Sequence, residues 1–226
     1  MTFDEVVLAD LRTQARSTKH AETGIWVAAQ LRQRIAAGQL APGSKLAEES
    51  LCEALAVSRN TLREAFATLH SEHIVTRIPN RGVFVAHPSA EDIREIYRVR
   101  RLLEPAAVLW SEQSPTAPLA SIVRSARSAA AAADIDAMAG ANQEFHRALV
   151  ARSGSERLNV LMEQVLAEMR LVFHSMAADP LFHEPYVEDN AQIVALLESG
   201  RRADAAEFLA DYLERAQTQL LQAVAR

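Results

Sequence analysis

The spacing of apolar residues changes along the first third of the chain. Apolar side chains recur at first every three or four positions, and then gather in short runs of β-branched residues. The predicted elements are helices near 22–37, 48–55 and 58–71, followed by strands near 74–78 and 83–86. Gly38 ends the first helix, Ser58 is the expected N-cap of the third, and Pro79–Gly82 forms the turn of the hairpin. Three helices followed by a hairpin predict a winged helix-turn-helix domain.

Every segment after Pro88 has the helical period. The apolar positions predict helices near 89–112, 117–132, 135–152, 156–177, 185–199 and 203–224. We therefore expect a mainly α protein with an N-terminal winged helix-turn-helix and a C-terminal all-α helical bundle. The expected divisions are an N-terminal extension at 1–20, the winged domain at 21–86, a linker at 87–88 and the bundle at 89–226. The extension fits either an extra short helix on the winged domain or a disordered basic tail.

The composition narrows the class of protein. Hydrophobic residues make up 49% of the 226 residues, with only seven glycines and eight prolines, which favours helices over an all-β or glycine-rich nucleotide-binding fold. The single cysteine, Cys52, rules out an intramolecular disulfide framework and a multi-cysteine zinc module. No apolar run approaches the ~18 residues of a membrane span, and the N-terminus lacks a signal-peptide layout. A cytoplasmic protein without a membrane partner is expected.

Charge is distributed unevenly between the two predicted domains. Residues 1–88 hold 10 Lys/Arg against 9 Asp/Glu, whereas residues 89–226 hold 14 against 20. The bases are concentrated between Leu11 and Lys45, where six accompany one acid. A mildly acidic protein with a locally basic N-terminal part fits contact with nucleic acid at that end, although an ordinary solvated face has the same composition.

The predicted third helix carries polar side chains that suit DNA recognition. They are Ser58, Arg59, Asn60, Thr61 and Arg63. Arginine can fork onto a guanine edge, asparagine pairs with adenine, and serine or threonine bonds to phosphate oxygens. At the hairpin tip, Arg81 and Gly82 suit a contact with the DNA backbone or minor groove, because glycine allows close approach. The alternative is a polar helix face that touches nothing.

Residues 38–86 strongly resemble the DNA-binding domain of the GntR family of bacterial transcription regulators. Three motifs carry the resemblance: Pro-Gly-x-x-Leu at 42–46, Val-Ser-Arg-x-x-x-Arg-Glu-Ala at 57–65 and Pro-Asn-Arg-Gly-x-x-Val at 79–85. The resemblance implies that Arg59 and Arg63 read bases, while Ser58, Asn60 and Arg81-Gly82 help to hold the duplex. The sequence departs from the family at Asn60-Thr61, where Thr-Pro is frequent, and at His73, where glycine is usual.

Four helices of the predicted bundle place a polar group within an otherwise apolar stripe. These groups are Arg100, Asn142 with His146 one turn later, Asn190 and Tyr212. Each alone has an ordinary explanation as a core side chain that finds a hydrogen-bond partner, and Arg100 has Glu104 one turn away. Burying all of them without partners is costly, so we expect them to converge on one water-filled or ligand-filled cavity.

The second domain resembles the ligand-binding domain of the fatty-acid-regulator (FadR/FCD-type) branch of the same family. Residues 95–105 match its opening helix, and Phe145-His146-Arg147-Ala148-Leu149 match its central one. Many members bind a divalent metal through an aspartate and three histidines, often with an organic acid beside it. Here those positions are Asn142, His146, Asn190 and Tyr212, a poor donor set for zinc or nickel. We therefore predict no metal and no other cofactor, with His174, His183 and Asp179 as the candidates for a shifted metal site.

These residues predict a regulator and not an enzyme. Cys52 belongs to a helix that packs against its neighbours, and Glu144 points away from His146 on its helix, so no catalytic residue is assigned. A scaffold has no use for a reading helix with two arginines. We predict a ligand-responsive transcription regulator, a repressor by the commoner family mode, that binds a palindromic double-stranded DNA operator as a homodimer. A small organic acid or related metabolite is the expected effector, with Arg100 as anchor for its carboxylate or phosphate.

Overall fold

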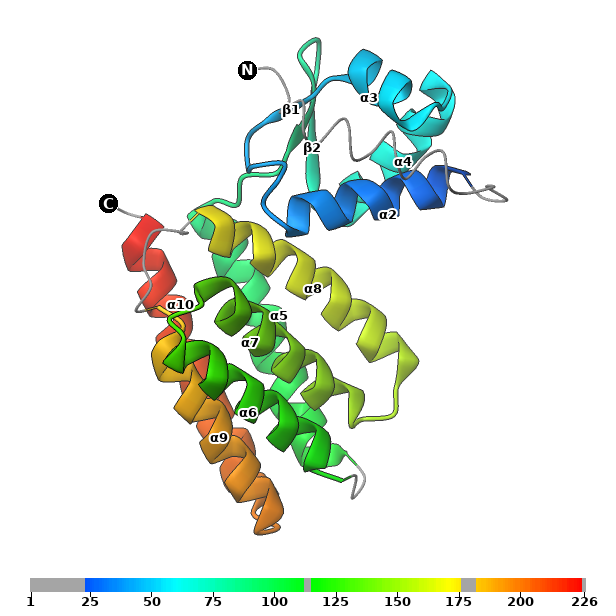
Figure 1. Cartoon of the computed structure of the whole chain (residues 1–226). Helices are drawn as coiled ribbons and strands as arrows, with labels where there is room; N and C mark the ends of the chain where they lie inside the picture. The colour runs from blue at the N-terminus through cyan, green and yellow to red at the C-terminus, as the bar shows by residue number, and fades with distance from the viewer. Residues whose placement is uncertain (1–22, 112–114, 176–181, 225–226) are drawn as a thin grey trace. The chain divides into compact units, whose positions relative to one another are not determined.

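The computed structural model describes residues 23–111, 115–175 and 182–224, which form two compact units. Among the described residues, the first contains 23–88 together with 170–175, and the second contains 89–111, 115–169 and 182–224. The elements up to Pro88 are α2 (Thr23–Ala36), β1 (Lys45–Leu46), α3 (Glu48–Leu55), α4 (Arg59–Ser71), β2 (Val75–Ile78) and β3 (Gly82–Val85) (Figure 1). After it come α5 (Ala90–Trp110), α6 (Ala117–Ala131), α7 (Ile135–Ala151), α8 (Glu156–Ser175), α9 (Glu184–Glu198) and α10 (Arg202–Val224).

The first unit is built on α4, which packs against both α2 and α3. The apolar side chains that gave α2 and α4 their helical period are the ones that become buried. Leu31 of α2 and Leu62, Phe66 and Leu69 of α4 are at most 1% exposed. Because one face of α4 is buried in this way, its polar face stays available to other molecules.

A three-stranded antiparallel sheet completes the first unit, in the order β1-β3-β2. The hairpin of β2 and β3 was predicted, and its register pairs Val75 with Val85 and Ile78 with Gly82. The sequence did not predict β1, which pairs Lys45 with Phe84. A strand of two residues is too short to show a period of its own, so its pairing with β3 is a finding of the structure.

The end of α4 shows how the backbone accommodates histidine at position 73, where the family usually has glycine. His73 follows the helix with a φ of +58°, in the left-handed region where glycine is usual. Its backbone N–H still bonds to the His70 carbonyl, and Ile74 N–H reaches the Leu69 carbonyl at 3.0 Å. The chain therefore keeps the usual end of the helix, although a residue with a β-carbon adopts the left-handed backbone conformation that favours glycine.

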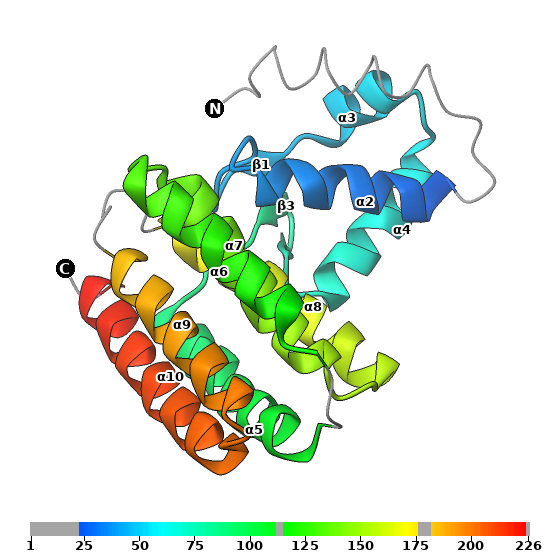
Figure 2. The ribbon, with the colours of Figure 1, turned by 60° about the horizontal axis from the view of Figure 1, so that its bottom comes forward.

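The second unit is a bundle of helices. In it α10 packs against α5 and α9, and α6 packs against α7 and α9; Figure 2 shows the first two pairings side by side. Fully buried side chains from different helices form its interior, among them Ile93, Val108, Phe145, Leu149, Leu209 and Leu213. The predicted helices are thus present, with ends that move by one or two residues. None of the helices within the described ranges is both long and apolar enough to cross a membrane.

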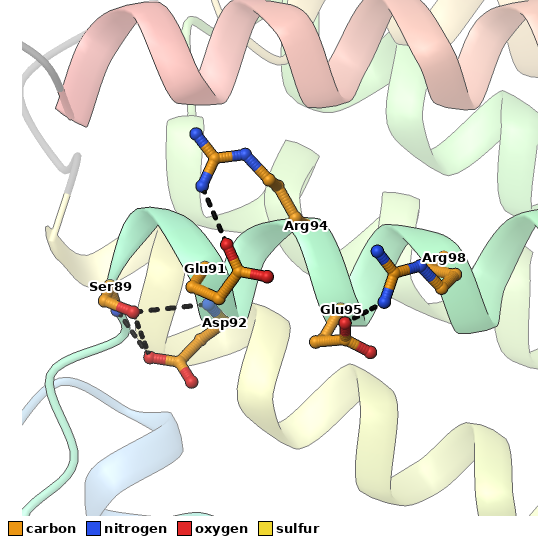
Figure 3. A network of polar contacts seen from close by, with 6 residues as sticks. All are labelled: Ser89, Glu91, Asp92, Arg94, Glu95 and Arg98. Carbon is orange, nitrogen blue, oxygen red and sulfur yellow. Dashed lines mark hydrogen bonds and ion pairs between the residues drawn. The ribbon is translucent and has the colours of Figure 1, made fainter.

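Helix α5 begins with a capping box, which fixes its starting point. The Ser89 hydroxyl accepts from Asp92 N–H, and the Asp92 carboxylate accepts from Ser89 N–H at 2.7 Å (Figure 3). Ion pairs between Glu91 and Arg94 and between Glu95 and Arg98 continue along the exposed side of the helix. The capping box fixes the residue at which α5 begins, and the ion pairs support its first turns.

Candidate functional site

The first turn of α4 is held by its own side chains. The Ser58 hydroxyl accepts a hydrogen bond from Thr61 N–H at 3.1 Å, and the two hydroxyls lie 2.9 Å apart. Ser58 is therefore the N-cap that the sequence predicted, and Thr61 supports it. Both residues position the start of the helix whether or not they also contact DNA.

The predicted reading side chains Arg59, Asn60 and Arg63 are exposed on α4. Two of them have an acidic partner. Asn60 donates from its amide nitrogen to Glu64 Oε1 at 2.8 Å, and Arg63 Nε lies 3.5 Å from Glu48 Oε2. The structure thus brings these residues to one exposed helix face with their side chains partly oriented.

The hairpin tip forms a second basic element. Gly82 has a φ of +109°, and a β-carbon at this position would lie 3.3 Å from Lys45 Cε, so glycine makes room for the lysine side chain. The Arg81 guanidinium lies over the Phe84 ring, 5.8 Å from its centroid. Lys45 is exposed on β1, directly opposite Phe84. The wing therefore presents Lys45 in addition to the predicted Arg81.

The predicted polar residues of the bundle meet in one buried cluster. Arg100 Nε donates to Glu104 Oε1 at 2.6 Å, and His146 Nδ1 lies 2.6 Å from Glu104 Oε2. Arg100 is 2% exposed and Glu104 is fully buried. The Arg100 guanidinium also lies over the Tyr97 ring, 5.0 Å from its centroid. Glu104 thus joins a cation on its own helix to the imidazole of α7.

The cluster continues from the imidazole to α9 and α10. His146 Nε2 lies 3.0 Å from the Tyr212 hydroxyl, which is 3.1 Å from Asn142 Oδ1. Asn142 Oδ1 also accepts from Asn190 Nδ2 at 2.9 Å. The Tyr186 ring packs edge-on against Tyr212, with centroids 4.9 Å apart. The five predicted pocket residues are therefore connected by hydrogen bonds that run through Glu104.

The ionisation states follow from burial and from Arg100. Burial alone would raise the pKa of Glu104, but the Arg100 charge and the His146 hydrogen bond outweigh it and bring that pKa to about 2. Burial lowers the pKa of His146, although Glu104 acts in the opposite direction. Burial also raises the pKa of Tyr97 to about 12. Near neutral pH the cluster thus contains a guanidinium, a carboxylate, a neutral imidazole and neutral phenols.

These states determine the direction of the hydrogen bonds. An ionised Glu104 only accepts, so His146 carries its proton on Nδ1 and offers a lone pair at Nε2. The single Tyr212 proton then has two acceptors in reach, His146 Nε2 and Asn142 Oδ1. Two buried atoms of this cluster have no hydrogen-bond partner among the described residues: Arg100 Nη2, a donor, and Asn190 Oδ1, an acceptor. A buried group left unpaired is costly, so these two atoms mark where a ligand or water has something to bond.

The donor chemistry of the cluster fits a metal poorly. Of the four candidate ligands only His146 Nε2 offers an imidazole nitrogen, and the others are two amides and a phenol that bond to one another. Within the described ranges no group of three or more His, Cys, Asp or Glu residues could hold a metal ion. His174 and His183 belong to no such group, and Asp179 lies outside the described residues.

The sequence reasoning missed two members of these sites. Glu104 was considered only as a partner for Arg100, yet it also bonds to His146, forty-two positions along the chain. The feature of the sequence that could have indicated this role is the position of Glu104 one turn after Arg100 on the same inward face of the helix. Lys45 was missed because only its pairing with the wing strand brings it beside Gly82.

Two family models match the chain. The model of the bacterial regulatory proteins of the gntR family matches residues 26–85, and the FCD domain model matches residues 95–215. The two matches coincide with the winged unit and with the bundle. The second alone covers more than half of the chain.

Characterised relatives and a solved structure agree with these matches. The gluconate operon transcriptional repressor of Bacillus subtilis is 40% identical over 95 residues, 42% of this chain but only 39% of the repressor. The Escherichia coli transcriptional regulator McbR is 25% identical over 87% of this chain and 92% of McbR. A crystal structure described as a putative transcriptional regulator GntR from Rhodococcus is 39% identical, with a TM-score of 0.82, covering 88% of this chain and 97% of that one. These relatives are transcription regulators.

Proposed function

Because this chain belongs to the GntR family of bacterial transcription regulators and carries an FCD domain, we propose that it represses transcription by binding a palindromic operator as a homodimer. A small organic acid or related metabolite in the bundle, without a metal, controls that binding. The proposal includes action in the cytoplasm, where bacterial DNA lies. The exposed polar face of α4 is the observation that carries it, since Arg59, Asn60 and Arg63 project from a capped helix whose other face is buried.

DNA reading is tested at Arg63. A selected operator duplex is obtained by enrichment of the full chain on a randomised library, and its affinity is compared with that of a scrambled duplex of equal composition. Arg63→Ala should weaken binding to the selected duplex by about 1–3 kcal/mol and flatten the sequence preference. Arg124→Ala is the matched control, because Arg124 is an exposed arginine of α6 and its loss changes the net charge equally. Equal losses on both duplexes would make Arg63 a phosphate contact instead.

The homodimer part of the proposal is supported by apolar side chains that stay exposed in one chain. Leu102 and Trp110 of α5 are 74% and 81% exposed, and Val160 of α8 is 52% exposed. Sedimentation equilibrium should give twice the chain mass for the unmodified protein, and Leu102→Glu should shift it towards the monomer. Ile25→Glu is the control, since Ile25 is 64% exposed in the winged unit. A monomer at all concentrations would refute this part.

The effector part rests on the unpartnered buried atoms Arg100 Nη2 and Asn190 Oδ1. An organic acid with a hydroxyl or amide group could accept from the first and donate to the second. A native mass spectrum of the purified protein, set beside the denatured mass, should show an additional organic mass and no metal. Arg100→Lys keeps a positive charge beside Glu104 but loses the forked guanidinium, so it should lose that mass while still binding DNA. One metal ion per chain would refute the metal-free part of the proposal.

A further inference from the structure

The side chain of Arg63 is in contact with an acid from the neighbouring helix. Arg63 Nε lies 3.5 Å from Glu48 Oε2, with side-chain exposures of 59% and 34%. Glu48 occupies the first turn of α3, where the helix dipole favours an acid. Arg59 lies on the same face of α4 and has no ion-pair partner in the part of the chain that the structure describes. Arg63 is thus the arginine of this face that is oriented before DNA arrives.

The Arg63 nitrogen that lies nearest to Glu48 determines which of the other guanidinium nitrogens can still bond to DNA. A guanidinium has three nitrogens, and contact at Nε leaves the two terminal nitrogens at the far end of the side chain. These two carry parallel N–H groups, and such a pair matches the O6 and N7 acceptors of guanine in the major groove. Because the Glu48 carboxylate lies nearest to Nε, both terminal nitrogens of Arg63 stay available for a base. An exposed pair of this kind is weak in water but strengthens where DNA excludes water and lowers the dielectric constant.

The same carboxylate has a second effect on DNA binding. Phosphate contacts supply most of the affinity for non-specific DNA, and an acid on the binding face opposes them. Glu48 therefore weakens binding to all duplexes, while its contact with Arg63 helps only where a guanine faces the arginine. The repulsion of phosphates is common to both kinds of duplex and cancels in the ratio of specific to non-specific affinity, so only the contact with Arg63 raises that ratio.

We propose that Glu48 is a positioning residue for sequence recognition, which orients the terminal nitrogens of Arg63 towards a guanine edge while it weakens binding to DNA of any sequence. This inference rests on the proposed DNA-binding function. It goes beyond it by assigning specificity to an acid on a helix that is not the reading helix.

The test is a double-mutant cycle of Glu48→Gln and Arg63→Ala in the full chain. The measured quantity is the ratio of affinities for the selected duplex and the scrambled duplex, at one fixed salt concentration. Glu49→Gln is the matched control, because Glu49 is the next residue of α3, is exposed, and has no ion pair among the described residues. Glu48→Gln keeps the side-chain shape but removes an acid from the first turn of α3, so the midpoint of urea unfolding should fall slightly, as it should for Glu49→Gln in the same turn.

We expect Glu48→Gln to lower the affinity ratio by about two- to fivefold, as the loss of one exposed ion pair allows, and to raise affinity for the scrambled duplex. In the Arg63→Ala background the same change should leave the ratio unaltered, because no guanidinium remains to be oriented. Glu49→Gln should alter both affinities by a similar factor. Equal behaviour of the Glu48 and Glu49 variants, or an undiminished Glu48 effect in the absence of Arg63, would overturn the proposal. Failure of the unmodified chain to enrich any duplex would instead refute the proposed DNA binding itself, and this inference with it.

Discussion

Replacing Glu104 by glutamine removes the central charge of the buried cluster while almost keeping its shape. Glu104 is fully buried and accepts from both Arg100 and His146 at 2.6 Å. A glutamine offers one acceptor oxygen and two N–H donors in the same space. His146 can move its proton to Nε2 and accept from the glutamine amide at Nδ1, because the Tyr212 hydroxyl can then donate to Asn142 Oδ1. The Arg100 charge, however, would stay buried without a counterion.

The expected cost is a large part of the stability of the bundle. Breaking a buried ion pair by removing one partner costs about 3–5 kcal/mol, because the remaining charge has lost its hydration and its compensation. Whole domains are stable by only about 5–15 kcal/mol. With a urea dependence of about 2 kcal/mol per molar, a loss of this size lowers the unfolding midpoint by about 2 M.

The assay has to report the two units separately. Urea unfolding followed by circular dichroism gives the overall change. Amide hydrogen exchange read on peptides of α5 and α10 locates it, since protection there depends on the free energy of opening the bundle. Peptides of α2 and α4 serve as the internal control and should keep their protection.

A double variant separates the charge from the packing. Arg100→Met with Glu104→Leu removes both charges and leaves only His146 Nδ1 without an acceptor, at a cost of about 1–3 kcal/mol. The double variant should therefore be more stable than Glu104→Gln alone. A loss below about 1 kcal/mol for Glu104→Gln, or a double variant less stable than the single one, would refute the argument that Glu104 compensates a buried charge.

Three further predictions concern pH, backbone strain and helix capping. The free energy of unfolding should fall on acidification in two stages, first below the ordinary histidine value of 6.5, because the pKa of His146 is lowered by burial and the unfolded chain takes up the proton first. The second stage lies between pH 4.5 and about 2, because Glu104 takes up a proton near its ordinary value in the unfolded chain but only near its lowered pKa in the folded protein. Urea titrations at several pH values should show that Glu104→Gln lacks this lower stage. His73→Gly should stabilise the winged unit by about 0.5–1 kcal/mol in urea unfolding, because it relieves the positive φ, and a loss would show that the imidazole contributes more than the strain costs. Ser89→Ala should destabilise α5 by about 0.5–2 kcal/mol, seen as a lower thermal midpoint, whereas Ser89→Thr keeps the hydroxyl and should lose little.

Local patterns in the sequence were sufficient for the helices and the hairpin, but not for contacts between elements. Periodicity predicted that α10 spans 203–224, and the structure has it at Arg202–Val224. It also placed Asn142 and His146 on an inward face, which both residues occupy. The ion pair of Glu48 with Arg63 joins two helices whose crossing no single segment encodes. The role of Glu104 likewise depends on a histidine of another helix.

Both arginines proposed to bind a ligand, Arg63 and Arg100, are held by a carboxylate at the same atom. Arg100 Nε bonds to Glu104 at 2.6 Å in the bundle interior, and Arg63 Nε lies 3.5 Å from Glu48 on an exposed face. In each case the acid lies at Nε; the two terminal nitrogens of Arg63 remain available for a ligand, and so does Nη2 of Arg100, which has no partner among the described residues. The two sites differ in hydration. A ligand of Arg63 must displace water from an exposed side chain, whereas the Arg100 guanidinium has already lost its hydration on folding. The cost of removing water from Arg100 is therefore part of the folding free energy of the bundle. An acidic effector that binds Arg100 does not meet this cost again, so the cost reduces its binding free energy less than it would at an exposed arginine.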